Sequence, residues 1–128
     1  MNFVICDTNI FISLFRNIEK TFEELALIGN ANILITSISV MELYQGMQNK
    51  RELEDMRKKI GRYNILHFNQ NSSTKAIDLI HHYRLSHNLE IPDAIIAAVS
   101  VVYNIPLFTY NVKDFKFIPG LTLYEPTA

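Results

Sequence analysis

The stretch "FVICDTN", residues 3–9, passes directly from apolar residues into a polar turn. An unbroken apolar run of this kind is typical of a strand that is buried on both faces of a parallel sheet. In such sheets the functional groups gather at the carboxyl ends of the strands. Asp7 therefore has two interpretations: a functional carboxylate at the edge of the sheet, or the N-cap of the helix that follows.

Short apolar runs and longer helical stretches alternate along the rest of the chain. The strand-like runs cover residues 3–6, 33–36, 65–68, 106–110 and 121–125, and the helical stretches cover 17–30, 37–47, 50–62, 72–87 and 93–104. Parallel strands need a helix to return the chain, so this order predicts an α/β fold with a mostly parallel central sheet and helices on both faces. The sequence contains no internal repeat or linker, and we expect a single domain over residues 1–128.

Residues that favour helix ends stand at several of these boundaries. We expect Gly29 and Asn30 to end the first helical stretch. Asn71 or Ser72 is expected to cap the stretch 72–87, and Pro92 to lie in the first turn of the last helix.

The composition is that of an ordinary globular domain, with 128 residues, 48% hydrophobic and 20% charged. The single cysteine, Cys6, lies inside an apolar run, which excludes an internal disulfide framework. No lysine or arginine precedes Asp7, and no apolar run reaches the roughly 18 residues of a membrane span. These features predict a cytoplasmic protein without a signal peptide or a membrane anchor.

Charge is concentrated in residues 50–62, which hold six basic and three acidic residues although the whole chain has a net charge of −1. One interpretation is a solvated helix face, because three oppositely charged pairs have i, i+4 spacing: Arg51 with Asp55, Glu54 with Lys58, and Asp55 with Lys59. The other interpretation is a contact with RNA phosphates through Lys58 and Lys59.

Four acidic residues lie at or near the carboxyl ends of predicted strands: Asp7, Glu42, Asp93 and Asp114. The carboxyl ends of parallel strands share one edge of a sheet, so these side chains could converge there. Several carboxylates in one pocket repel one another unless a cation holds them, and Mg²⁺ prefers oxygen ligands. The pattern is therefore compatible with a metal site.

Each of these acids also has a structural interpretation. Ser39 to Glu42 fits the S-x-x-E capping box, in which the glutamate bonds the N-cap amide. Asp93 could complement a helix N-terminus, and Asp114 could form an Asx turn. The residue pattern leaves both interpretations open.

Other catalytic motifs are absent from the sequence. The four glycines form no phosphate-binding loop, the four histidines have no zinc-site spacing, and no G-x-S-x-G elbow occurs. A haloacid-dehalogenase phosphatase would need a second aspartate where Asn9 stands. A receiver-type phosphoacceptor would need a lysine for which Lys113 is the only candidate.

The segments "ICDTNIFISLF", "SISVMELYQGM", "IPDAIIAAVSVVYNIPLFTYNVKDF" and "PGLTLYEP" resemble the PIN-domain ribonucleases, specifically the VapC toxins of VapBC toxin–antitoxin pairs. The resemblance covers nearly the whole chain in the expected order. It implies a three-layer α/β/α sandwich and an endoribonuclease that hydrolyses RNA phosphodiester bonds with Mg²⁺ or Mn²⁺. The alternative is a catalytically silent PIN-fold module with a binding or regulatory role.

The resemblance also implies roles for individual residues. The family's acidic quartet is matched by Asp7, Glu42, Asp93 and Asp114, and the polar positions beside the first and fourth acids are matched by Thr8, Asn9, Thr109 and Asn111. These polar residues are expected to orient the carboxylates and metal-bound water. Tyr110 stands where the family often has an arginine, so no phosphate contact is implied there.

An antitoxin protein and a second copy of the chain are the protein partners that the resemblance implies. The apolar residues Phe22, Leu25 and Ile28 favour a helical face that takes part in such contacts.

Overall fold

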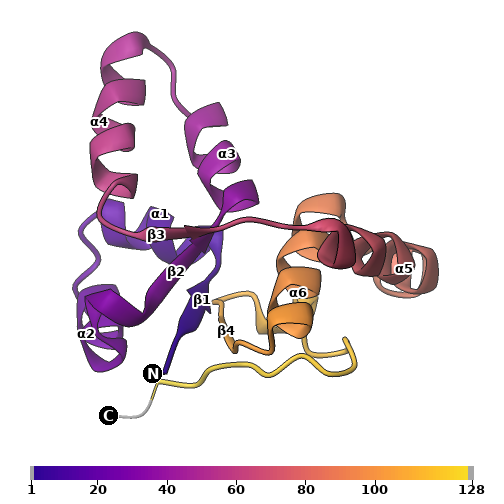
Figure 1. Cartoon of the computed structure of the whole chain (residues 1–128). Coiled ribbons are helices and arrows are strands. Elements are labelled where there is room, and N and C mark those ends of the chain that lie inside the picture. The colour runs from indigo at the N-terminus through magenta and orange to yellow at the C-terminus, as the bar shows by residue number, and fades with distance from the viewer. Residues whose placement is uncertain (1, 127–128) are drawn as a thin grey trace.

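The computed structural model describes residues 2–126 and contains four strands, six α-helices and two 3₁₀ helices in this part of the chain (Figure 1). The elements are, in order, β1 (Val4–Cys6), α1 (Thr8–Phe15), α2 (Glu19–Ile28), η1 (Asn30–Asn32), β2 (Ile33–Thr36), α3 (Ser37–Gln45), α4 (Lys50–Ile60), β3 (Asn64–Leu66), α5 (Gln70–His87), α6 (Ile91–Tyr103), β4 (Leu107–Phe108) and η2 (Val112–Asp114).

The strands form one parallel sheet in the order β3-β2-β1-β4. β1 lies between β2 and β4, with Ile5 opposite both Leu34 and Leu107. The strand expected at 121–125 is reduced to a single bridge between Leu107 and Leu123. The predicted α/β fold with a parallel sheet is confirmed.

Side-chain alternation along the strands divides the core into two clusters, one on each face of the sheet. Val4 and Cys6 point into a cluster with apolar residues of α1, α2 and α4. Ile5 points the other way, into a cluster with residues of α5 and α6. Figure 1 shows these two groups of helices on opposite sides of the sheet. The structure is therefore the three-layer sandwich that the sequence predicts.

The apolar face of α2 belongs largely to this core. Leu25 and Ile28 are buried, whereas Phe22 is 49% exposed. The prediction that Leu25 and Ile28 belong to a partner-binding face is therefore wrong, because β1 and β2 already cover them.

The beginning of α5 also differs from the prediction. Asn69 is the N-cap, and its side chain accepts a hydrogen bond from the Ser72 N–H at 2.9 Å. In return the Asn69 N–H donates to Ser72 Oγ at 2.7 Å, which completes a capping box. Asn71 and Ser72 therefore lie inside the helix.

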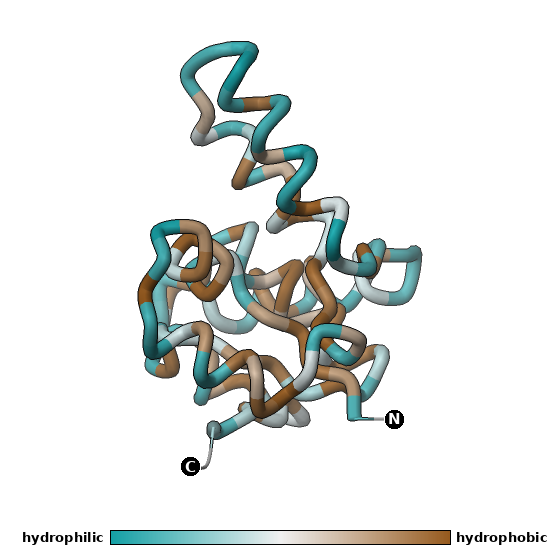
Figure 2. Tube along the Cα trace, turned by 90° about the vertical axis from the view of Figure 1, so that its left-hand side faces the viewer, coloured by the Kyte–Doolittle hydropathy of each residue, from teal (hydrophilic) through white to brown (hydrophobic). Residues whose placement is uncertain are grey.

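Helices α3 and α4 form a hairpin that projects from the sheet, and the chain of α4 is mostly hydrophilic (Figures 1 and 2). Only Met56 and Ile60 of α4 are buried. None of the three predicted i, i+4 pairs forms an ion pair within the described residues 2–126. Glu54 instead pairs with Arg57 at 2.5 Å. The predicted solvent-exposed helix face is present, but its ion pair joins Glu54 to Arg57 with i, i+3 spacing.

Cys6 is a free, buried cysteine in the centre of the sheet. Burial raises the pKa of its thiol, so this group stays protonated and packs as a small apolar side chain. Among the helices of residues 2–126, none combines the length and apolar character needed to cross a bilayer.

The capping box of α5 generates a test of the helix boundary. We expect Asn69→Ala to lower the free energy of unfolding by about 1 kcal/mol, because it leaves the Ser72 N–H without its acceptor. Asn71→Ala is the matched control. Asn71 is the second residue of the helix and caps nothing, so its replacement should leave the free energy of unfolding nearly unchanged or raise it slightly. Urea unfolding of the three proteins measures both effects, and equal losses in the two variants would contradict the assignment.

Candidate active site

The parallel sheet brings four acidic residues to the edge formed by the carboxyl ends of its strands. Asp7 follows β1 directly, and Glu42 lies on α3, which follows β2 without a loop. Asp93 lies in the first turn of α6, and Asp114 ends η2 after β4. Because β1 is hydrogen-bonded to both β2 and β4, the segments that leave these three strands are neighbours.

Asp7 is the most deeply buried of the four acids, with a side chain that is 5% exposed. Its Oδ1 accepts the N–H of Thr8 at 2.8 Å, as expected of the N-cap of α1. Its Oδ2 accepts the hydroxyl of Thr109 at 2.8 Å and the amide of Asn9 at 3.1 Å. The N-cap interpretation of Asp7 is therefore confirmed, because one oxygen caps α1. The other oxygen is held at the edge of the sheet by Asn9 and by Thr109, which follows β4, and its functional role stays a prediction.

Glu42 does not form the predicted capping box. Helix α3 begins three residues earlier than that motif requires, and Thr36 is its N-cap, accepting the Ser39 N–H at 3.2 Å. Glu42 is thus free to face α1, where its Oε1 accepts the hydroxyl of Thr8 at 2.7 Å. Thr8 Oγ1 also lies 2.8 Å from Ser39 Oγ, so one hydroxyl joins the first two acidic segments.

Electrostatic coupling is strongest at Asp93. Burial is the largest cause that raises the pKa of its carboxyl, to about 7, and the negative charges of Asp7, Asp114, Glu42 and Glu90 raise it further. Burial also raises the pKa of Asp7, against the opposing effect of its hydrogen bonds to Thr109 and Thr8. The two central carboxyls therefore hold protons more tightly than free aspartates do.

The polar residues beside the acids differ in what they contact. Thr109 is buried and reaches Asp7, and Asn9 also lies 3.3 Å from Thr109 Oγ1. Asn111 is exposed and joins this group through its backbone N–H, which donates to Thr109 Oγ1 at 3.0 Å. Asp114 lies on the rim, where it lines a small cavity together with Asp93.

Tyr110 is a structural residue that sequence analysis did not identify. Its hydroxyl is hydrogen-bonded to Glu24 and lies 2.7 Å from Thr21 Oγ1, and its backbone N–H donates to Asn9 Oδ1 at 3.2 Å. Tyr110 thus ties α2 to the loop that carries Thr109. Nothing in the sequence pattern signals this contact, because its partners are 86 and 89 residues away.

The donor set at this edge fits a hard divalent cation. The ligand atoms are carboxylate and hydroxyl oxygens, and the mutual repulsion at Asp93 is the kind that a cation relieves. Within residues 2–126, however, no three acidic, histidine or cysteine side chains already converge as a ligand cluster.

The PIN domain family model matches residues 4–121. The chain belongs to the PIN domain family. Over 47 residues the chain is 43% identical to a protein named Ribonuclease VapC from Rickettsia bellii, strain RML369-C. That match covers 37% of this chain and 34% of the relative, so it spans about a third of the relative's length.

Solved structures extend the similarity to the whole PIN domain. A chain of a toxin-antitoxin complex from Klebsiella pneumoniae is 29% identical, with a TM-score of 0.77 over 97% of this chain and 98% of that one. A chain of VapBC2 from Rickettsia felis, bound to a promoter DNA fragment, is 27% identical, with a TM-score of 0.77 over 95% and 97%. A chain of DNA-bound VapBC from Salmonella typhimurium, at 22% identity and a TM-score of 0.83 over 97% and 98%, shares the fold.

The raised pKa of Asp93 predicts a pH-dependent stability in EDTA. Between the ordinary value of 3.8 and about 7 the folded state binds more protons than the unfolded state, so stability falls as pH rises through this range. Asp93→Asn removes the effect. We expect this variant to be more stable than wild type at pH 8, by roughly 1–2 kcal/mol after allowing for solvent screening, and the difference to shrink towards pH 4.

Urea unfolding between pH 4 and pH 8 measures this difference. Asp55→Asn is the control, because it removes the same charge from an exposed position on α4. A variant Asp93→Asn that is less stable than wild type at every pH would show that the carboxylate stabilises the helix start instead.

Proposed function

We propose that this PIN domain is a metal-dependent endoribonuclease, with Mg²⁺ or Mn²⁺ as the cofactor and residues 1–128 as a single nuclease domain. The observation that carries the proposal is the coupling of Asp93 to Asp7, Glu42 and Asp114 at one edge of the sheet. Clustered acids that repel one another are costly in a purely structural role, whereas a bound cation would offset the repulsion.

In this proposal the four acids are metal ligands of different kinds. Asp7 and Asp93 are the central ligands, Glu42 is the next, and Asp114 acts through water or the substrate. Thr109 and Asn9 hold one oxygen of Asp7, and Thr8 orients Glu42. When bound, the cation supplies an activated water and neutralises the charge that builds on the phosphate during hydrolysis.

Protonation of Asp93 makes cation binding at the proposed site depend on pH. Near neutral pH its carboxyl holds a proton for part of the time, because its pKa lies at about 7. Asp93 has to release this proton before it can ligate a cation, so cation binding tightens as the pH rises. Burial of Asp7 has the same effect in the same direction.

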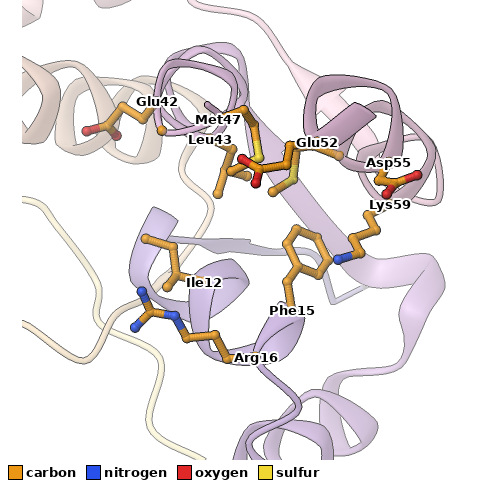
Figure 3. Close-up of a pocket in the computed structure, with 11 residues that line it drawn as sticks. Ile12, Phe15, Arg16, Glu42, Leu43, Met47, Glu52, Asp55 and Lys59 are labelled. Atoms are coloured by element: carbon orange, nitrogen blue, oxygen red, sulfur yellow. The ribbon is translucent and has the colours of Figure 1, made fainter. Parts of the chain in front are cut away.

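Lys58 and Lys59 in the last turn of α4 are proposed to contact RNA phosphates. Lys59 also lies over the ring of Phe15, with its Nζ 5.5 Å from the ring centroid. This contact holds the ammonium group of Lys59 beside Phe15, the last residue of α1 (Figure 3).

The chain is further proposed to be the toxin of a toxin–antitoxin pair. A groove between α1, α3 and α4, with a volume of about 380 Å³, offers a place for a segment of the antitoxin (Figure 3). Its floor is apolar and its rim is charged; the floor includes Phe15, Leu43, Met47 and Met56, and the rim includes Arg16, Glu52, Asp55 and Lys59. Amphipathic helices bind to grooves of this kind.

A homodimer is also part of the proposal. Between α5 and α6 an apolar cleft stays open, and Ile77 and Ile91 on its rim are 70% and 66% exposed. We propose that a second copy of the chain covers this cleft, and not the face of α2, where Leu25 and Ile28 are buried.

RNA cleavage by variants that each lack one acidic charge of the site tests the nuclease proposal. We expect the purified protein to cleave single-stranded RNA with Mg²⁺ or Mn²⁺ and not in EDTA. Asp7→Asn and Asp93→Asn should each lower the rate at least 100-fold, because each removes a ligand charge while preserving shape. Asp55→Asn serves as the control and should cleave normally. A wild-type protein that cleaves no RNA with either ion would support the silent-module alternative.

The antitoxin groove is tested by a charge placed on its floor. Met47→Glu should weaken binding of the cognate antitoxin at least tenfold, because a carboxylate would be buried against apolar residues. Met41→Glu, on the exposed side of α3, should bind normally. Calorimetric titration of the two variants measures the affinities, and equal affinities would exclude the groove as the docking site.

A further inference from the structure

The small cavity beside Asp93 and Asp114 lies where α5 ends and α6 begins. Its volume is about 120 Å³, and its lining residues are His87, Asn88, Leu89, Glu90, Asp93 and Asp114. Two of these, Asp93 and Asp114, belong to the proposed active site, so the cavity adjoins the place where the scissile phosphate would lie. None of the six residues is a lysine or an arginine. The lining is therefore unsuited to a phosphate group.

The ring of His87 is held in a fixed plane at this cavity. It is stacked on Phe117, with ring centroids 4.0 Å apart and an interplanar angle of 17°. Tyr83 contacts the His87 ring edge-on at 5.7 Å, and Ser86 Oγ lies 2.8 Å from Nδ1. His87 nevertheless remains exposed, whereas Phe117 is half-buried. A ring that is oriented from one side and open to solvent can accept a second flat group.

We propose that His87 and this cavity form a nucleobase subsite, in which the base next to the scissile phosphate of a single-stranded RNA stacks on the His87 ring. This inference rests on the proposed nuclease function. Proteins that bind single-stranded RNA stack unpaired bases on aromatic side chains, histidine included, and hydrogen-bond the base edges. Asn88 and Glu90 supply polar groups for such an edge.

His87 lines the same cavity as two carboxylates of the proposed active site, Asp93 and Asp114. It lies at the last residue of α5, and only five residues separate it from Asp93 in the chain. A base held there would keep the adjoining phosphate beside Asp93 and Asp114. His87 is therefore a substrate-binding residue, and its loss should change KM rather than kcat.

Substitutions of His87 that keep or remove a flat side-chain ring test this proposal. His87→Phe keeps a stacking ring, whereas His87→Leu fills a similar volume and packs on Phe117 without one. We expect His87→Leu to raise KM for a short single-stranded RNA about fivefold or more with kcat within about twofold of wild type, and His87→Phe to retain the wild-type KM. His87→Gln is a second variant without the ring. His81→Leu, on the exposed surface of α5, is the control.

A binding measurement in EDTA separates this proposal from the nuclease proposal. An RNA that carries 2-aminopurine should lose fluorescence when that base stacks on wild type or His87→Phe, but not on His87→Leu or His87→Gln. Equal KM values and equal quenching in all four proteins would overturn the subsite. Quenching that depends on the ring, in a wild-type protein that cleaves no RNA with Mg²⁺ or Mn²⁺, would support the subsite and reject the nuclease proposal.

Discussion

The burial of a carboxylate at the end of the central strand is the constraint on which this site depends. β1 is covered on both faces, so Asp7 enters an environment in which an unpaired charge is costly. Three hydrogen bonds, from Thr8, Asn9 and Thr109, offset that cost and fix both carboxylate oxygens. The bond from Thr109, which directly follows β4, also ties the end of β1 to the segment that leaves the neighbouring strand.

The same burial sets the charge state of the neighbouring acids. Asp93 lies at the start of an apolar helix, and the low dielectric there strengthens repulsion from Asp7, Glu42 and Asp114. Without a cation the site relieves this repulsion by taking up a proton. With a cation the same four residues can all stay ionised, so proton uptake and metal binding compete for one set of oxygens.

Three of the concave surfaces in the described part of the chain differ in chemistry, and each therefore has a different proposed ligand. The groove along α1, α3 and α4 combines an apolar floor with a charged rim and suits an amphipathic protein segment. The cleft between α5 and α6 is almost entirely apolar and suits a second copy of the chain. The cavity at His87 is polar, with a flat ring beside it, and suits a nucleobase.

Periodicity and local residue types predicted the parallel sheet, the positions of the acids and the helices α2 to α6, because these patterns depend on neighbours along the chain. The helical stretches did not include α1, and the strand expected at 121–125 is only a single bridge. The same reasoning gave a capping box as one of two interpretations of Glu42 and placed Asn71 or Ser72 at a helix start. Neither cap forms. Thr36 and Asn69 are the N-caps instead, so both helices begin two or three residues earlier than these patterns indicate. Only the tertiary structure decided what each acid touches, since the hydroxyl that holds Asp7 comes from a residue 102 positions away. Contacts at that separation are set by the packing of the sheet, and no local pattern records them.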